Sequence, residues 1–210
     1  MPTTPGRKPY DSTRRTAAAR RTRTAVVRAF GELLVADGFK AATIRAVAER
    51  AGVSAETVYK TFGGKQGLIK ALWDITLAGD DEPVAMLDRE QARAVLAADE
   101  PATKLWLFAG NVRAIHERVT PLATLLAQAG PEGAAVLATG EQERRVSVRV
   151  LVDHLADLGA LRPDVDAAHG ADACWALTTT AVFAKLTTEA DWDGAAYQRW
   201  LADMLSATLL

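Results

Sequence analysis

The 210-residue sequence has a single cysteine, three histidines and no long hydrophobic run, and each shortage excludes a class of protein. Cys174 alone cannot form an internal disulfide bond, which favours a reducing compartment. No stretch of about 18 apolar residues is free of charge, and the N-terminus has no apolar signal region. We therefore expect a soluble cytoplasmic protein, associated with the nucleoid if it binds DNA.

The sequence contains few residue patterns that are typical of metal sites or of enzyme active sites. His116, His154 and His169 are widely spaced and have no companion cysteines, so we expect no metal site and no cofactor. Ser147, His154 and Asp157 contain the residue types of a catalytic triad. Ser147 and His154 are nevertheless two helical turns apart, and nothing resembles a nucleophile elbow, so we expect no enzyme.

The sequence is rich in alanine, with 42 residues, and its charge is unevenly distributed. Apolar residues recur every three or four positions and do not alternate, so we predict an all-helical fold. Residues 1–70 contain 14 lysines and arginines against 5 acids, a net charge of +9, whereas residues 71–210 contain 11 against 21, a net charge of −10. The basic end is suited to contact nucleic-acid phosphates, and a solvated basic tail is the alternative explanation for part of it.

Residues 43–65 have the pattern of two short helices joined by a tight turn. Thr43 and Ser54 are suited to cap the two helices, and Gly52 to provide the positive φ of the turn. Val58 would pack the second helix against the first. The outward side chains of the second helix are small, hydroxyl-bearing or charged: Ala55, Glu56, Thr57, Tyr59, Lys60 and Thr61. Spacing alone fits either an ordinary helical hairpin or a helix-turn-helix that enters a DNA major groove.

Neighbouring residues extend this pattern from about Thr22 to Leu72. The motifs are Gly38-Phe39, Thr43, Ile-x-x-Val-Ala-x-x-Ala-Gly-Val-Ser from Ile44, Thr57-Val58-Tyr59, and Phe-x-x-Lys-x-x-Leu from Phe62. With these motifs the chain resembles the tetracycline-repressor (TetR) family. It departs from the family pattern at Gly64, usually Ser, and at Gln66, usually Glu, so the following helix lacks a side-chain cap and an anionic residue at its start.

The resemblance implies which residues bind DNA. The predicted DNA-binding residues are Thr43, Arg45, Ser54, Ala55, Thr57, Tyr59, Lys60 and Lys65. Thr43, Tyr59 and Lys65 stand where the family commonly binds phosphates. Thr57 and Lys60 stand where base edges are read, and simple packing is the alternative for Tyr59. Because one helix reads few base pairs, a homodimer on a near-palindromic operator is expected.

We predict an N-terminal three-helix helix-turn-helix domain joined to a larger helical bundle. The segments are a basic arm with the start of the first helix (1–21), a DNA-binding domain (22–70), and a ligand-binding and dimerisation domain (71–210). Prolines predict a mobile arm over residues 1–11, and the basic stretch 7–23 is either solvated or a further DNA contact. The predicted helices are 12–36, 44–51, 55–62, 65–78, 88–98, about 101–121 with a short continuation to 128, 140–158, 166–188 and 193–209, with a turn at 130–133.

The last two predicted helices, 166–188 and 193–209, each carry two apolar faces, which is more than the core of one protomer requires. We predict that they form a four-helix dimer interface about a two-fold axis, as the resemblance also implies. The predicted interface residues are Cys174, Leu177, Ala181, Tyr197, Trp200, Leu201, Met204 and Leu205.

The larger domain carries no motif of its own, but its core-facing stripes contain large and polar residues that suit a small-molecule cavity. They are Trp106, Asn111, His116, His154, Trp175, Thr178, Thr179 and Phe183, and all except His116 form the predicted ligand site. Each alone also fits an ordinary core or surface residue. No cluster of arginines is evident in the sequence, so we expect an apolar or amphipathic effector that changes DNA affinity by shifting the fourth helix.

These expectations together describe a dimeric, sequence-specific transcriptional regulator, in the simplest case a repressor released from its operator by a small molecule. The alternatives are a helical protein-interaction module, or a small-molecule-binding protein that does not read DNA specifically. The charge asymmetry favours the regulator, because neither alternative needs a basic N-terminal end.

Overall fold

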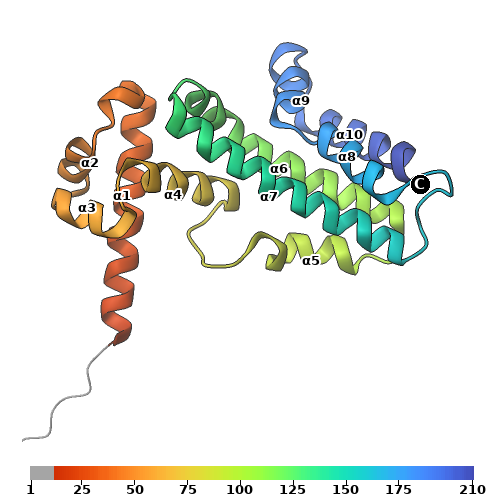
Figure 1. Cartoon of the computed structure of the whole chain (residues 1–210), viewed down its shortest axis with the longest axis horizontal. Coiled ribbons are helices and arrows are strands. Elements are labelled where there is room, and N and C mark those ends of the chain that lie inside the picture. The colour runs from red at the N-terminus through yellow and green to blue at the C-terminus, as the bar shows by residue number, and fades with distance from the viewer. Residues whose placement is uncertain (1–11) are drawn as a thin grey trace, which may run out of the picture. The chain divides into compact units, whose positions relative to one another are not determined.

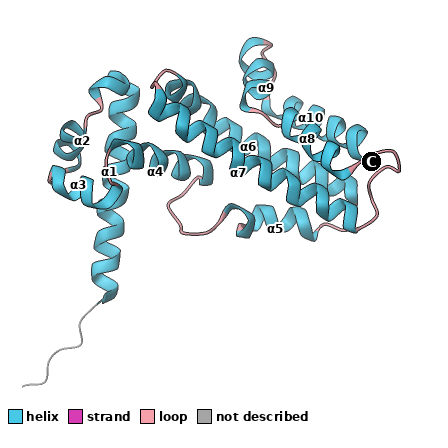
Figure 2. Ribbon diagram, in the orientation of Figure 1, coloured by secondary structure: helices cyan, strands magenta, loops and turns pink. Residues whose placement is uncertain are grey.

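The computed structural model describes residues 12–210, and side chains from residue 16 onward. All regular elements in this part of the chain are helices, as predicted, and none is a strand (Figures 1 and 2). The chain divides into two compact units, with the boundary between Leu72 and Trp73. The predicted arm at residues 1–11 lies outside the described residues. No helix in the described range is long and apolar enough to cross a membrane.

The first unit is built from short helices around a small core. Its elements are α1 (Ser12–Ala41), α2 (Ile44–Ala51), α3 (Ala55–Phe62) and the start of α4 (Lys65–Ala78). Phe30 and Leu34 of α1 are buried with Val47 of α2, Val58 of α3 and Leu68 of α4. Each helix therefore contributes one apolar stripe to a shared core, as the three- and four-residue spacing predicts.

The second unit is a helical bundle. It contains η1 (Met86–Asp88, a 3-10 turn), α5 (Glu90–Ala97), α6 (Pro101–Ala127), α7 (Pro131–Asp157), α8 (Ala167–Leu177), α9 (Thr180–Ala184), η2 (Lys185–Glu189, a π-helical turn) and α10 (Gly194–Leu209). The long helices α6 and α7 lie side by side, with α5 packed along α6 and with α8 and α10 on the other side of the pair (Figure 1). Leu105, Leu151, Leu155 and Leu201 are fully buried in the core between them.

The short helical continuation predicted after Pro121 is part of one helix, because α6 continues through this residue to Ala127. A proline inside a helix removes one backbone hydrogen bond and crowds the preceding turn, which together cost about 3 kcal/mol. Val119 and Leu122, on either side, are buried, and burial of such side chains contributes roughly 1.5–3 kcal/mol each. Packing therefore outweighs the lost bond.

The predicted turn at residues 130–133 is wrong. Gly130 precedes the helix and Pro131 begins α7, where a missing N–H costs nothing. Gly133 does not break the helix: a Cβ at this position would lie 2.1 Å from the carbonyl oxygen of Leu126. Glycine is needed there for the close approach of α6 and α7, so the cluster of turn-forming residues marks a helix start.

The single helix predicted over residues 166–188 is interrupted at Thr178. The hydroxyl of Thr179 accepts a hydrogen bond of 3.2 Å from the amide of Val182 and so caps α9. The buried Thr178 hydroxyl donates to the carbonyl of Cys174 at 2.8 Å and accepts from Arg144 of α7 at 2.8 Å. Arg144 therefore links α7 to the C-terminal end of α8 through Thr178. Thr179 caps the helix that follows the break.

His116 of α6 is buried in the bundle beside Phe183, with their ring centroids 5.4 Å apart. Its Nδ1 is buried without a hydrogen-bond partner in the described part of the chain. Burial, with a smaller contribution from the positive charge of Arg144, lowers the pKa of His116 to about 4. The native protein therefore keeps this imidazole neutral at physiological pH.

We expect His116 to make the protein less stable as the pH falls from 7 to 5. In the unfolded chain a histidine binds its proton near pH 6.5, whereas in the folded protein the pKa of His116 is about 4. Unfolding is therefore linked to proton uptake between these values, which lowers the free energy of unfolding by about 2 kcal/mol from pH 7 to pH 5. Urea titrations at both pH values, compared with His116→Gln, measure this difference. An equal pH dependence in the two proteins contradicts the assignment.

Candidate nucleic-acid interface and ligand cavity

The turn between α2 and α3 has the local geometry predicted for it. The Thr43 hydroxyl accepts from the amide of Ala46 at 3.2 Å and caps α2. The Ser54 hydroxyl accepts from the amide of Thr57 at 3.1 Å and caps α3. Gly52, between them, has a φ of 68°, which glycine adopts at little cost. Both predicted caps and the predicted turn glycine are thus confirmed as structural features.

The outer face of α3 is free of the core of its own unit. Val58 is fully buried, whereas Ala55 and Lys60 are exposed and the side chain of Tyr59 is 56% exposed. The half-buried Thr57 shares a hydrogen bond of 2.9 Å between its hydroxyl and that of Ser54. The exposure of Tyr59 argues against simple packing as its role, because a phenol that served packing would be covered.

Two cations among the predicted DNA-binding residues have partners inside this unit. Arg45 forms an ion pair of 3.0 Å with Glu49 on the exposed face of α2. The Lys65 ammonium lies 3.8 Å from the centroid of the Phe39 ring and donates to the Phe39 carbonyl. Lys65 therefore links the start of α4 to the C-terminal end of α1, which is a structural role beside its predicted contact with DNA.

The junction between α3 and α4 explains one departure from the TetR pattern. Gly63 and Gly64 have φ values of 73° and 130°. The second value lies in a region that side chains with a Cβ rarely adopt, so the serine expected at position 64 would be strained in this conformation. At the last residue of α3, the ring centroid of Phe62 lies 5.0 Å from the Arg23 guanidinium of α1.

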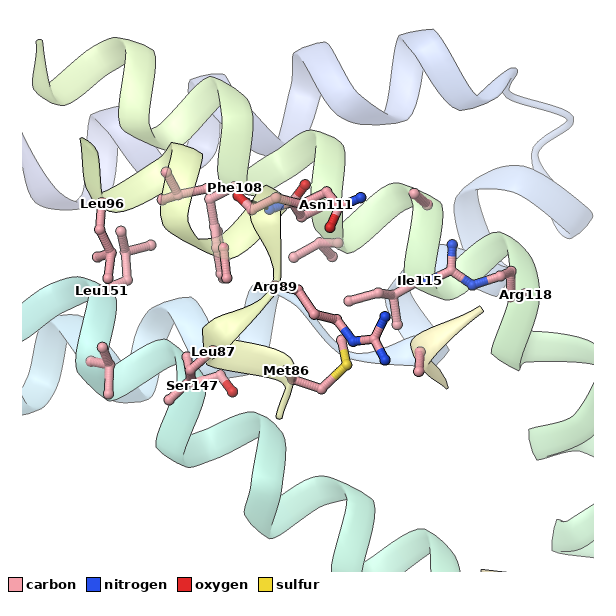
Figure 3. Close-up of a pocket in the computed structure, with 17 residues that line it drawn as sticks. Met86, Leu87, Arg89, Leu96, Phe108, Asn111, Ile115, Arg118, Ser147 and Leu151 are labelled. Atoms are coloured by element: carbon pink, nitrogen blue, oxygen red, sulfur yellow. Dashed lines mark hydrogen bonds between the residues drawn. The ribbon is translucent and has the colours of Figure 1, made fainter. Parts of the chain in front are cut away.

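The second unit contains a cavity of about 200 Å³ beside the middle of α6. Its walls come from the end of α4, from η1 and α5, and from the facing sides of α6 and α7. They consist of Ala78, Met86, Leu87, Arg89, Gln91, Ala92, Val95, Leu96, Phe108, Asn111, Val112, Ala114, Ile115, Arg118, Ser147, Val150 and Leu151. Figure 3 shows Leu96, Phe108 and Leu151 toward one end and Arg89 and Arg118 toward the other. The cavity therefore has an apolar end and a cationic end.

The two arginines of the cavity are held by different partners. Arg89 donates to the Asp80 carboxylate at 2.6 and 3.0 Å, and this hydrogen bond lowers the pKa of Asp80. Arg118 donates to the carbonyl oxygens of Thr76 at 3.2 Å and Leu77 at 2.8 Å. These carbonyls belong to the last turn of α4, where a cation offsets the negative end of the helix dipole. One wall of the cavity is thus bonded directly to the end of α4.

Comparison with known proteins identifies the first unit. Residues 27–72 match the family of bacterial regulatory proteins described as the tetR family. Over 41 residues the chain is 46% identical to YvkB, an uncharacterized HTH-type transcriptional regulator of Bacillus subtilis (strain 168). Residues 27–72 therefore carry the region that is shared by the tetR family of bacterial regulatory proteins. The aligned stretch covers 20% of this chain and 22% of YvkB, so it spans about a fifth of that relative.

Solved structures of transcriptional regulators share the fold along most of the chain. NalD of Pseudomonas aeruginosa is 19% identical, with a TM-score of 0.70 and coverage of 92% of this chain and 98% of NalD. FadR of Bacillus subtilis is 14% identical, with a TM-score of 0.65 and coverage of 89% and 99%. A TetR transcription regulator from Haloarcula marismortui is 16% identical, with a TM-score of 0.65 and coverage of 91% and 100%. This family and this fold are those of transcriptional regulators, which are not enzymes.

Of the predicted ligand residues, the cavity contains Asn111, whose amide nitrogen donates to the Gln91 carbonyl at 3.0 Å. The others lie elsewhere. Trp106 is 43% exposed, His154 is half-buried on α7, Trp175 lies beside the Arg144 guanidinium, Thr178 and Thr179 form the α8–α9 break, and Phe183 is in the core. Arg89 and Arg118 line the cavity but were not predicted from the sequence. A signal for Arg89 is its position a few residues after the acidic cluster at residues 80–82.

The predicted dimer residues fall into two groups. Four are buried in the protomer's own core, so their side chains are not available to a second chain: Cys174, Tyr197, Leu201 and Leu205. Their helices α8 and α10 pack on each other and on α6 and α7, which uses one apolar face of each. Four others are exposed or half-buried and stay predicted interface residues: Leu177, Ala181, Trp200 and Met204. Burial also raises the pKa of the Cys174 thiol to about 12, which makes it unreactive.

Proposed function

We propose that this protein is a homodimeric, sequence-specific DNA-binding repressor that leaves a near-palindromic operator when a small apolar or amphipathic molecule binds. The observation that carries the proposal is the outer face of α3. Ser54 caps this helix and Val58 anchors it, while Ala55, Tyr59 and Lys60 are exposed. A short, anchored helix with small, aromatic and cationic groups on its outer face is suited to the major groove.

Electrostatics support the same proposal. The first 70 residues carry a net charge of +9 and the remainder a net charge of −10. A basic end attracts duplex phosphates, and the acidic remainder discourages nonspecific wrapping by the rest of the chain. Lys60, exposed on α3, is the cation best placed to reach a base edge or phosphate.

The proposed dimer would use the outer faces of α8 and α10. Trp200 and Leu177 are half-buried in the protomer, and Met204 is 36% exposed. Apolar side chains in this state gain further burial when a second copy covers them. Two copies of α3 would then read two half-sites about one helical turn apart, which gives the operator its symmetry.

We expect Trp200→Glu or Leu177→Arg to produce monomers, because each places a charge where the second copy would bury an apolar side chain. Light scattering gives the mass of the particle in solution. The matched control is Val146→Glu, since Val146 is 59% exposed on α7, a helix that carries none of the predicted interface residues. A dimer mass for both interface variants contradicts this interface.

The proposed effector site is the cavity of about 200 Å³. A cavity of roughly 150 Å³ in another protein holds benzene, so this one suits a molecule of about ten non-hydrogen atoms. FadR of Bacillus subtilis was solved in complex with stearoyl-CoA, and NalD is the secondary repressor of the MexAB-OprM multidrug efflux pump. An effector the size of stearoyl-CoA exceeds the cavity of this chain, so we infer a smaller one.

The proposed coupling runs through the end of α4. A molecule in the cavity contacts Ala78 and Arg118, and Arg118 holds the carbonyls of Thr76 and Leu77. An effector that prefers the non-binding arrangement by about 2 to 3 kcal/mol would weaken DNA affinity by tens to a hundredfold. The effect is reciprocal, because bound operator then weakens effector binding by the same factor.

Selection of bound duplexes from a random DNA pool tests the proposal. We expect the enriched sequences to share a near-palindromic pair of half-sites. If the pool shows no enrichment over an unselected library at low ionic strength, the chain does not read DNA, and the alternative of a protein-interaction module gains support. Repeating the selected binding reaction with small molecules then tests the response to an effector.

A further inference from the structure

Arg89 brings an unsatisfied donor to the cavity wall. Its side chain is only 12% exposed, and two of its nitrogens are bonded to Asp80. Its Nε is buried and has no acceptor among the described residues. A buried N–H without a partner destabilises the protein, so a group in the cavity that accepts a hydrogen bond from it gains affinity.

The charged side chains that line the cavity are all positive. Arg89 and Arg118 line the cavity, and among its described lining residues none is acidic. Asp80 neutralises Arg89 from outside this lining, and the remaining polar side chains of the wall are Gln91, Asn111 and Ser147. Such a wall attracts an anionic group, and it repels a cationic one.

We propose that the effector is a small amphipathic carboxylic acid, with its carboxylate at Arg89 and Arg118 and its hydrocarbon body against Phe108, Val112 and Leu151. This inference rests on the proposed function, because it assigns the chemistry of the proposed effector site. Two carboxylate oxygens can accept from the free Nε of Arg89 and from the Arg118 guanidinium. The apolar end of the cavity lies opposite these groups in Figure 3, which matches a molecule with one charged end.

The same contact supplies the regulatory step. Arg118 donates to the carbonyls of Thr76 and Leu77 in the last turn of α4. A carboxylate is a stronger acceptor than a backbone carbonyl, because its bond to a guanidinium is charge-assisted. A bound acid therefore competes with the end of α4 for Arg118 and loosens that end. A neutral molecule of the same length lacks this competition and leaves α4 capped.

The test uses three probes that share an eight-carbon chain and differ only in the head group: octanoate, octanol and octylamine. We expect calorimetry on the full chain to give octanoate at least about tenfold tighter than octanol, since a charge-assisted bond is worth roughly 1.5–3 kcal/mol. Octylamine should bind weakest. Equal affinity for octanoate and octanol, or tighter binding of octylamine, overturns the proposal.

We expect the two variants of the Arg89–Asp80 ion pair to change octanoate affinity in opposite directions. Arg89→Gln removes the free Nε and its charge, so octanoate should bind at least about tenfold more weakly while octanol changes little. Asp80→Asn removes the competing carboxylate, so octanoate should bind several-fold more tightly. Arg93→Gln is the matched control, because Arg93 is exposed on α5 and does not line the cavity. Circular dichroism establishes that each variant is folded, and changes of the same sign in both ion-pair variants contradict the assignment.

The outcomes for acid binding and for DNA binding are separable. If a selected operator is found but octanoate has no advantage over octanol, the acid proposal fails and the DNA-binding function stands. If octanoate is preferred but no duplex is selected, the cavity assignment stands and the DNA-binding function fails. If both hold, octanoate should weaken operator binding of the unmodified protein, and Arg118→Gln should reduce that effect.

Discussion

Gly67→Ala is expected to disrupt the first unit. A Cβ at position 67 would lie 1.7 Å from the carbonyl oxygen and 2.8 Å from the carbonyl carbon of Phe62. These are backbone atoms at the end of α3, so no side-chain rotation relieves the clash, and α3 and α4 must separate. We expect a loss of about 3 kcal/mol or more in the free energy of unfolding. Operator binding should fall with it, because the position of α3 depends on this junction.

The matched control is Gly31→Ala in α1. The added Cβ would lie 3.3 Å from a terminal methyl group of Leu72, which can move. Alanine also favours a helix interior by about 1 kcal/mol over glycine. Thermal or urea unfolding should therefore show that Gly67→Ala lowers the free energy of unfolding, whereas Gly31→Ala leaves it unchanged or raises it. Equal stabilities for the two variants contradict the close packing of α3 on α4.

Tyr59→Glu is expected to abolish operator binding without loss of stability. Tyr59 is 56% exposed on α3, so its replacement removes little packing. If α3 lies against duplex phosphates, the new carboxylate faces like charges, which costs several kcal/mol and weakens binding by at least about a hundredfold. Fluorescence anisotropy with the selected duplex measures the affinity, and thermal unfolding measures the stability.

Val35→Glu makes the same charge change elsewhere in the same unit. Val35 is 76% exposed on α1, outside the helix-turn-helix pair. It changes the net charge of the unit equally, so long-range repulsion of DNA is matched between the two variants. We expect Val35→Glu to weaken binding at least tenfold less than Tyr59→Glu. Equal losses would mean that net charge alone matters and that α3 does not contact DNA.

The first unit could be predicted closely from the sequence because its signals are local. Thr43, Gly52 and Ser54 act within a turn of their own positions, and the structure gives them the predicted capping and turn roles. The apolar stripes of α1 to α4 lie at helical spacing and are buried as expected. Helix caps and apolar helix faces depend only on residues that are close in the sequence. Residue propensity and spacing are therefore enough to predict them here.

The cavity and the outer faces of the second unit depend on residues far apart in the sequence. Arg118 donates to the carbonyls of Thr76 and Leu77, about 40 positions earlier in the sequence. The residue spacing in α6 does not indicate that α4 holds its partners. Gly133 and Pro131 have the composition of a turn, yet lie in a helix because α6 packs closely there. Tyr197 has the large apolar side chain of an interface residue, but the protomer's own core covers it. Such outcomes follow from tertiary packing, which overrides local preference.

The most direct test of the account is the ratio of two dissociation constants, for the selected duplex and for a scrambled duplex of equal length, at one fixed salt concentration. Specific regulators bind their sites roughly a thousandfold or more tighter than other DNA, and we predict a ratio of about that size for this protein. A ratio near one, with and without octanoate, would contradict the claim that α3 reads DNA sequence.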